Sequence, residues 1–248
     1  MDAWDLVHEH RYAEALALYD EEAREKPEDY LVLANRATVL LCMGKLDVAL
    51  NNFALANELQ YTASKRTASP FSEDIATIQW LRGESATAVQ TLRNKIDGLR
   101  HGSLKFSDMA GGISTGLLLW FMGERTADAN CVEYAKAFVQ AALRRPKGLC
   151  WPGPIARYLM DEITFSAVLR VAGGCSNLED VARKAMTDLL VRRQYCQSLF
   201  YKALRMQMEG DKAGYDQWMI ACSKMENPII EREWYLARGE CEKKNRGS

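Results

Sequence analysis

The chain repeats its own pattern between residues 3–22, AWDLVHEHRYAEALALYDEE, and residues 37–56, ATVLLCMGKLDVALNNFALA. The equivalent pairs are Ala3 and Ala37, Leu6 and Leu40, His10 and Gly44, Ala15 and Ala49, and Tyr19 and Phe53. The shift of 34 residues is the period of stacked helix–turn–helix repeats. Repeats of this kind are helical throughout, so the sequence predicts an all-α fold.

Later glycines extend the pattern down the chain. Gly83, Gly123 and Gly210 each stand where one helical stretch is expected to end and another to begin, a place that suits a left-handed backbone. Seven positions earlier a small residue recurs, as Ala76, Gly116 and Ala203. The position four before the turn is apolar except in the third hairpin, which has Gln79. Small residues at this site allow two paired helices to approach closely, so the pattern predicts five hairpins.

Residues 1–60 resemble two units of the tetratricopeptide repeat (TPR) family. Residues 150–240 resemble the end of a class of bacterial TPR proteins, some of which are envelope lipoproteins. The residues that match that class are Trp151-Pro152-Gly153-Pro154-Ile155, Cys196 with Phe200-Tyr201, Gly210-Asp211, and Glu233 with Ala237-Arg238. The resemblance implies a TPR-like α-solenoid, a right-handed superhelix of antiparallel hairpins that ends in a C-terminal capping helix. No lipobox cysteine follows an apolar leader, so the lipoprotein placement does not carry over.

The predicted organisation is one solenoid domain over residues 1–248. Residues 1–60 form the two best-matching repeats, and residues 70–148 form two expanded repeats after a Ser/Thr-rich connector. A degenerate hairpin is expected over 150–175, where Pro154 and Thr164 begin its helices and Gly173-Gly174 ends it. The last repeat and the capping helix occupy 178–242, with Ser176 and Glu179 as a capping box and the final helix near Ile229–Glu240.

Composition and charge exclude several classes of partner. The net charge is −1 and the sequence pI is about 6.4, so no global field attracts nucleic acid. A basic cluster, Lys243, Lys244 and Arg246, is interpreted as part of a solubilising polar tail. Seven cysteines lack any CxxC pair and indicate free thiols in a reducing compartment. We expect neither a signal peptide nor membrane insertion, and we predict a cytoplasmic location.

No catalytic residue, metal ligand or cofactor site is predicted, and the chain is not expected to be an enzyme. His8 and His10 are two positions apart, which points two helical imidazoles in different directions. The run Gly111–Gly116 lacks the Gly-Lys-Ser/Thr ending of a phosphate loop. Acidic pairs such as Glu73-Asp74 are interpreted as solvated helix faces or caps.

The predicted partner-binding residues lie on the first helix of each hairpin, which lines the concave groove in the TPR fold. They are Trp80, Trp120, Thr38, Leu41, Thr77 and Arg205. Trp80 and Trp120 each stand three positions before a proposed turn glycine, and exposed tryptophans are favoured at binding hot spots. The alternative is that both rings pack between neighbouring hairpins, and the sequence favours neither interpretation.

The predicted function is a non-enzymatic protein–protein interaction module, an adaptor or scaffold that binds a partner protein in the concave groove. One alternative is a bacterial immunity protein that binds and neutralises a cognate toxin, and a second is a secretion chaperone. Some TPR domains bind acidic chaperone tails through cations on their first helices. The third hairpin has Glu73 and Asp74 where those cations would stand, and repulsion between carboxylates argues against that class of ligand.

Overall fold

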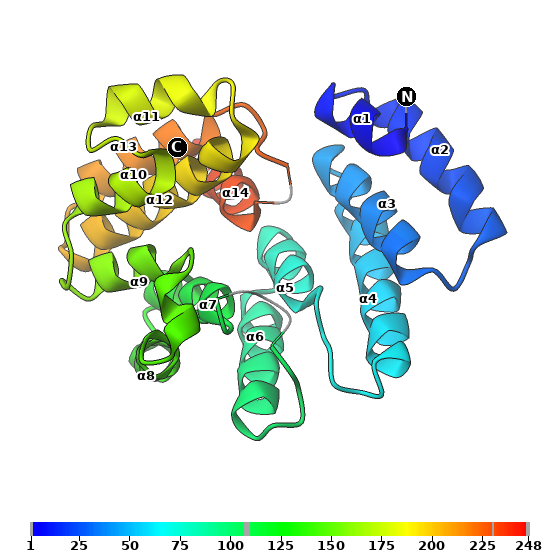
Figure 1. Cartoon of the computed structure of the whole chain (residues 1–248), viewed down its shortest axis with the longest axis horizontal. Helices are drawn as coiled ribbons and strands as arrows, with labels where there is room; N and C mark the ends of the chain where they lie inside the picture. The colour runs from blue at the N-terminus through cyan, green and yellow to red at the C-terminus, as the bar shows by residue number, and fades with distance from the viewer. Residues whose placement is uncertain (1, 107–109, 230, 247–248) are drawn as a thin grey trace. The chain divides into compact units, whose positions relative to one another are not determined.

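The structure is a computed structural model that describes residues 2–106, 110–229 and 231–246. Every regular element in these residues is a helix, which confirms the all-α prediction. The chain forms two compact units, residues 1–107 and 108–248. Consecutive helices pack against one another in each unit (Figure 1). Residues 107–109, inside the range 70–148 predicted for the expanded repeats, lie outside the described residues.

The first unit consists of three consecutive hairpins. Their helices are α1 (Ala3–His8) and α2 (Tyr12–Glu25), α3 (Tyr30–Cys42) and α4 (Leu46–Ala63), and α5 (Ser72–Leu81) and α6 (Ser85–Arg100). The turns contain His10, Gly44 and Gly83, all of which adopt a positive φ, as predicted for the two glycines. The small contact residues Ala37 and Ala76 are fully buried, as close helix pairing requires.

Three polar residues of α5, Glu73, Asp74 and Gln79, depart from the pattern that the sequence predicts. Gln79 replaces the apolar residue of the other hairpins, and its Oε1 accepts a hydrogen bond from Thr91 Oγ1 on α6 at 2.9 Å. Glu73 and Asp74 are interpreted from the sequence as a solvated helix face or a cap. Both are buried, so the first of these interpretations is wrong, and both lie in the first turn of α5. Lys95 Nζ on α6 lies 2.6 Å from Glu73 Oε2 and pairs the buried charge.

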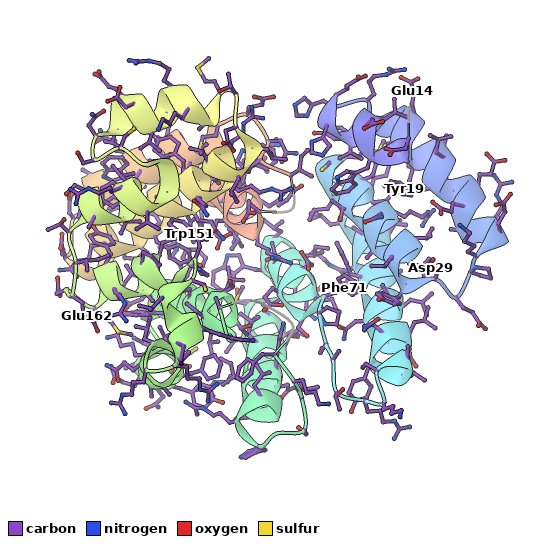
Figure 2. The ribbon with its side chains drawn as sticks, in the orientation of Figure 1. Glu14, Tyr19, Asp29, Phe71, Trp151 and Glu162 are labelled. Atoms are coloured by element: carbon purple, nitrogen blue, oxygen red, sulfur yellow. The ribbon has the colours of Figure 1, made fainter. Side chains whose placement is uncertain are left out.

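The connector between the second and third hairpins is fastened to α4 by side chains. Asn57 Oδ1 accepts hydrogen bonds from Ser69 Oγ at 3.2 Å and from the Phe71 backbone N–H at 3.3 Å. The Phe71 ring, just before α5 (Figure 2), lies 5.9 Å from the Phe53 ring of α4. These contacts hold the irregular connector against α4, so that α5 follows as the first helix of the next hairpin.

The second unit begins with one long hairpin and ends with another. Its helices are α7 (Ile113–Thr126), α8 (Ala129–Leu143), the 3₁₀ helix η1 (Pro146–Leu149), α9 (Gly153–Leu159), α10 (Phe165–Gly173), α11 (Leu178–Ala185), α12 (Leu189–Met208), α13 (Lys212–Ser223) and α14 (Arg232–Arg246). The closest helix pairs are α7 with α8, α12 with α13, and α13 with α14. Helix α12 also packs against α10 and α11 (Figure 1).

The turn of the α7–α8 hairpin is not at Gly123, which corrects the sequence prediction. Gly123 lies inside α7, and the residue with positive φ is Ala127, at 54°. A Cβ on Gly123 would lie 3.0 Å from the Val132 backbone nitrogen of α8, so this glycine serves close packing. Gly116, seven residues earlier on the same helix, also faces α8. A Cβ added to it would lie 2.5 Å from Val139 Cγ2.

The short helices between the two long hairpins begin close to their predicted positions. Helix α9 begins at Gly153, and the Thr164 side chain caps α10 by accepting from the Ala167 N–H. The cap of α11 is Asn177, whose Oδ1 accepts from the Asp180 N–H at 2.9 Å, and not the predicted Ser176. The last helix begins three residues later than predicted, at Arg232, and residue 230 lies outside the described residues.

Trp151, Tyr201 and Glu233 are joined by polar contacts through the interior of the second unit. Trp151 Nε1 donates to Gln197 Oε1 at 2.5 Å, and Gln197 Nε2 donates to Glu233 Oε1 at 3.2 Å. The Tyr201 hydroxyl donates to the same Glu233 oxygen at 3.1 Å. This chain of polar contacts joins the entry of α9, the middle of α12 and the first turn of α14.

Candidate functional site

The predicted partner-binding residues do not form one open surface. Thr38, Leu41, Thr77 and Trp80 belong to the first unit and are buried, and Trp120 and Arg205 belong to the second. The exposed fractions of Trp80 and Trp120 are 4% and 1%. Rings buried to this degree offer little contact area to a partner in this conformation.

The premise that the two tryptophans share one register is wrong. Trp80 lies three positions before the turn at Gly83, whereas Trp120 lies seven positions before the turn at Ala127. The polar groups near Trp120 are engaged within the unit: its Nε1 donates to Glu124 Oε1 at 3.1 Å, and Lys136 Nζ lies 5.1 Å from its ring centroid. Binding of a partner by these rings stays a prediction.

Arg205 is likewise engaged inside the second unit. Its Nη2 lies 2.6 Å from Asp161 Oδ1, and its Nε lies 2.5 Å from Glu209 Oε1. The hydrogen bond from Arg205 lowers the pKa of the Asp161 carboxyl. The guanidinium therefore fixes α12 to the loop after α9.

The second unit has a groove along α13 and α14. It consists of two adjoining cavities of about 520 and 400 Å³ that share Tyr215, Asp216, Glu240 and Lys244. The first cavity is also lined by Arg125, Gln207, Gly210, Lys212 and Lys243, and the second by Met219, Ile220, Ser223, Lys224 and Cys241. We call this surface the α13–α14 groove. Its combined size is within the range of ligand-binding clefts.

Local sequence places α13 along one side of the groove. Gly210, at φ 78°, reverses the chain after α12. Asp211 then caps α13, because its Oδ1 accepts from the Gly214 N–H at 2.8 Å. The helix that follows presents Tyr215 and Met219 one turn apart towards α14.

The floor of the groove contains a buried carboxylate with several partners. The Glu240 side chain is 5% exposed, and its Oε2 lies 2.7 Å from Arg125 Nη2. The Tyr215 hydroxyl donates to the same oxygen at 3.2 Å, and Lys243 Nζ lies 3.5 Å from Oε1. Burial, and then the charge of Glu240, raise the pKa of Tyr215, so the phenol stays protonated and remains a donor.

The rim of the groove is mainly basic. Lys244 Nζ pairs with Asp216 Oδ2 at 2.6 Å, yet its side chain remains 57% exposed. Lys212 and Lys224, at opposite ends of α13, are exposed and form no ion pair with any described residue. Ile220 adds an apolar contact that is 40% exposed. A floor that combines the buried Glu240 with apolar side chains such as Met219, beneath a charged rim, suits a peptide that has both kinds of residue.

A third cavity, of about 430 Å³, has fewer charged side chains in its lining. It is lined by Gln140, Leu143, Arg144, Arg157 and Glu162. Arg157 Nη1 and Glu162 Oε2 (Figure 2) pair at 2.8 Å across it. Elsewhere in the part of the chain that the structure describes, there is no cluster of three potential metal ligands, and no helix is long and apolar enough to cross a membrane.

Sequence reasoning missed the α13–α14 groove because its parts are far apart in the chain. Lys243 and Lys244 were assigned to a polar tail, but they lie on α14 and line the groove. Arg125 comes from α7, and its pairing with Glu240 spans 115 positions. The spacing of Glu240, Lys243 and Lys244 places them on one face of a helix, and this was the sequence feature that could have indicated the groove. The spacing alone does not reveal what that face packs against.

The chain was also compared with known proteins. No protein-family model, no curated protein and no solved structure matches it.

Proposed function

We propose that this chain is a non-enzymatic protein-binding module, a TPR-like α-solenoid that acts as an adaptor by holding a segment of a partner protein. The observation that supports this most directly is the α13–α14 groove, which combines apolar side chains, Met219 and Ile220, with a charged rim. We place the contact in this groove because the predicted tryptophan rings are buried.

The architecture supports the same proposal. Hairpins that pair through fully buried small residues, such as Ala37 and Ala203, form rigid supports. A rigid surface binds a segment of another chain with little cost in ordering its own side chains. All seven cysteines are free thiols, which supports a reducing compartment such as the cytoplasm.

Selection of a displayed random-peptide library against the purified full-length chain tests the proposal. We expect saturable binders whose addition slows backbone hydrogen exchange in residues 212–224 and 232–244. We also expect Ile220→Arg to weaken them by about tenfold or more, because a charged side chain would occupy the apolar part of the groove.

Leu149→Arg is the matched control. Leu149 is also an exposed apolar residue of the second unit, at 72%, and it lines neither cavity of the groove. Both variants add one positive charge, and both should keep the wild-type circular dichroism spectrum. Equal weakening by the two variants, or the absence of any saturable binder, would contradict the proposal.

A further inference from the structure

We propose that the α13–α14 groove selects an acidic, carboxylate-bearing segment of its protein partner. This inference rests on the proposed function and specifies the chemistry of the ligand. The proposal is based on the excess of positive over negative side chains along the groove. Five cations line its two cavities, namely Arg125, Lys212, Lys224, Lys243 and Lys244, whereas only Asp216 and Glu240 oppose them.

This imbalance is local and not a property of the whole chain. The lining has two carboxylates against five cations, a net charge of +3, while the chain as a whole has a net charge of −1. Since charges farther apart than about 8–10 Å are screened at physiological salt, a ligand in the groove experiences mainly the local set. The groove is therefore electropositive for a bound segment.

The two opposing carboxylates are largely neutralised by the protein itself. Glu240 is buried and is contacted by Arg125, Lys243 and the Tyr215 hydroxyl. Asp216 is paired with Lys244 at 2.6 Å. The accessible charges at the rim are the outer faces of these cations together with Lys212 and Lys224, which form no ion pair among the residues that the structure describes.

Buried Glu240 also prearranges one cation for the ligand. Arg125 donates to Glu240 through both Nε, at 2.8 Å, and Nη2, at 2.7 Å, which fixes the plane of the guanidinium. The Arg125 side chain is still 34% exposed. A fixed and partly exposed guanidinium can bind a second carboxylate without the loss of rotamer freedom that a mobile arginine would pay.

The length and floor of the groove favour a peptide over a nucleic acid. Lys212 and Lys224 are twelve positions apart on α13 and its C-cap, or about 18 Å at 1.5 Å per residue, which spans about five or six residues of extended peptide. The exposed apolar contact is Ile220, which suits an aliphatic side chain. Single-stranded nucleic acids require accessible aromatic faces, whereas Tyr215 is buried and Arg125 lies over its ring at 5.1 Å.

Fluorescence anisotropy with short labelled peptides tests the inference on the full-length chain. The first probe is a hexapeptide in which glutamate alternates with leucine, and the second has glutamine in place of each glutamate. We expect the acidic probe to bind about tenfold or more tightly than the neutral probe, and to weaken as salt increases.

Lys212→Glu/Lys224→Glu should weaken the acidic probe by about tenfold or more, because both side chains line the groove and neither forms an ion pair that the substitution would break. The matched control is Lys45→Glu/Lys147→Glu, which makes the same change in net charge at two exposed lysines outside the groove. The control should bind within about twofold of wild type.

Three results would overturn the inference. The first is equal binding of acidic and neutral probes, and the second is equal weakening by the two double variants. The third is tighter binding of a labelled single-stranded oligonucleotide than of the acidic probe. If the neutral probe binds as tightly and Ile220→Arg abolishes its binding, acidic selectivity is refuted while the proposed protein-binding function stands.

Discussion

Glu233 shows how one buried carboxylate shapes the interior of the second unit. Gln197 and Tyr201 both donate to its Oε1, while its Oε2 is buried without a hydrogen bond from any described residue. Burial raises the pKa of Glu233, because the charged form loses more hydration than its partners replace. The folded chain therefore holds a proton here at a pH where the unfolded chain has released it.

The sign of the pH dependence follows from linkage. A raised carboxyl pKa contributes stability that is fully present below the unfolded pKa and is lost as pH rises through the folded pKa. We predict that Glu233→Gln raises the urea midpoint at neutral pH, since glutamine resembles the protonated acid. The gain should shrink as pH falls towards the ordinary glutamate pKa, about 4.3. A gain that does not vary between pH 4 and pH 8 would contradict this prediction.

Gly116 gives a second prediction at the scale of one residue. Alanine is ordinarily favoured over glycine inside a helix by about 1 kcal/mol. Here the added Cβ would lie 2.5 Å from Val139 Cγ2, and a β-branched neighbour has few alternative rotamers. We expect Gly116→Ala to lower the free energy of unfolding by about 1–3 kcal/mol in urea titrations.

Gly98→Ala is the matched control for Gly116→Ala. Gly98 is also a helical glycine, but the atoms nearest its added Cβ, at 2.6–3.4 Å, all belong to the side chain of Leu104, a half-buried residue after α6 that can move away. Its effect should be close to neutral or stabilising. Equal destabilisation at the two sites would show that close approach of α7 and α8 is not the cause.

At the scale of elements, the turns were predictable where glycine marks them and unpredictable where it does not. Gly44, Gly83 and Gly210 adopt the expected positive φ. In the fourth hairpin alanine takes this conformation, and the nearby glycine serves packing instead, so the sequence signal pointed four residues too early. Glycine is used both for a left-handed turn and for close packing of two helices, and the local sequence does not distinguish these two uses.

The partners of polar residues could not be predicted where they are distant in the sequence. In the sequence, Glu73 resembles a solvated acidic residue in the first turn of a helix. In the structure it is paired with Lys95 of the next helix. The α13–α14 groove depends in the same way on Arg125 meeting Glu240. Periodicity identifies which face of a helix is apolar, but it does not identify the partner of each polar side chain.

Ala127 yields a prediction for the α7–α8 turn. A left-handed backbone costs an alanine about 1 kcal/mol that glycine avoids, so Ala127→Gly should raise the free energy of unfolding by roughly that amount. Gly44→Ala should have the opposite sign, because φ there is 72° and an added Cβ meets nothing within 4 Å. Thermal melts of both variants test the pair, and a shift of the same sign in both would refute it.

For the whole molecule, the division into two units has a functional consequence. All residues that line the α13–α14 groove belong to residues 108–248. We predict that a fragment of residues 108–248, shown to be helical by circular dichroism, binds the acidic probe with an affinity within about threefold of the full chain. A folded fragment with no affinity for the probe would place part of the binding determinant in the first unit.

The buried tryptophans have a photophysical consequence. Trp80 lies in the first unit and Trp120 in the second, and both indoles are shielded from water. Each should emit at short wavelength in the native chain and shift to the red when its own surroundings unfold. Variants that retain only one of the two, with the other tryptophans replaced by phenylalanine, would therefore follow the melting of each unit by a separate optical signal.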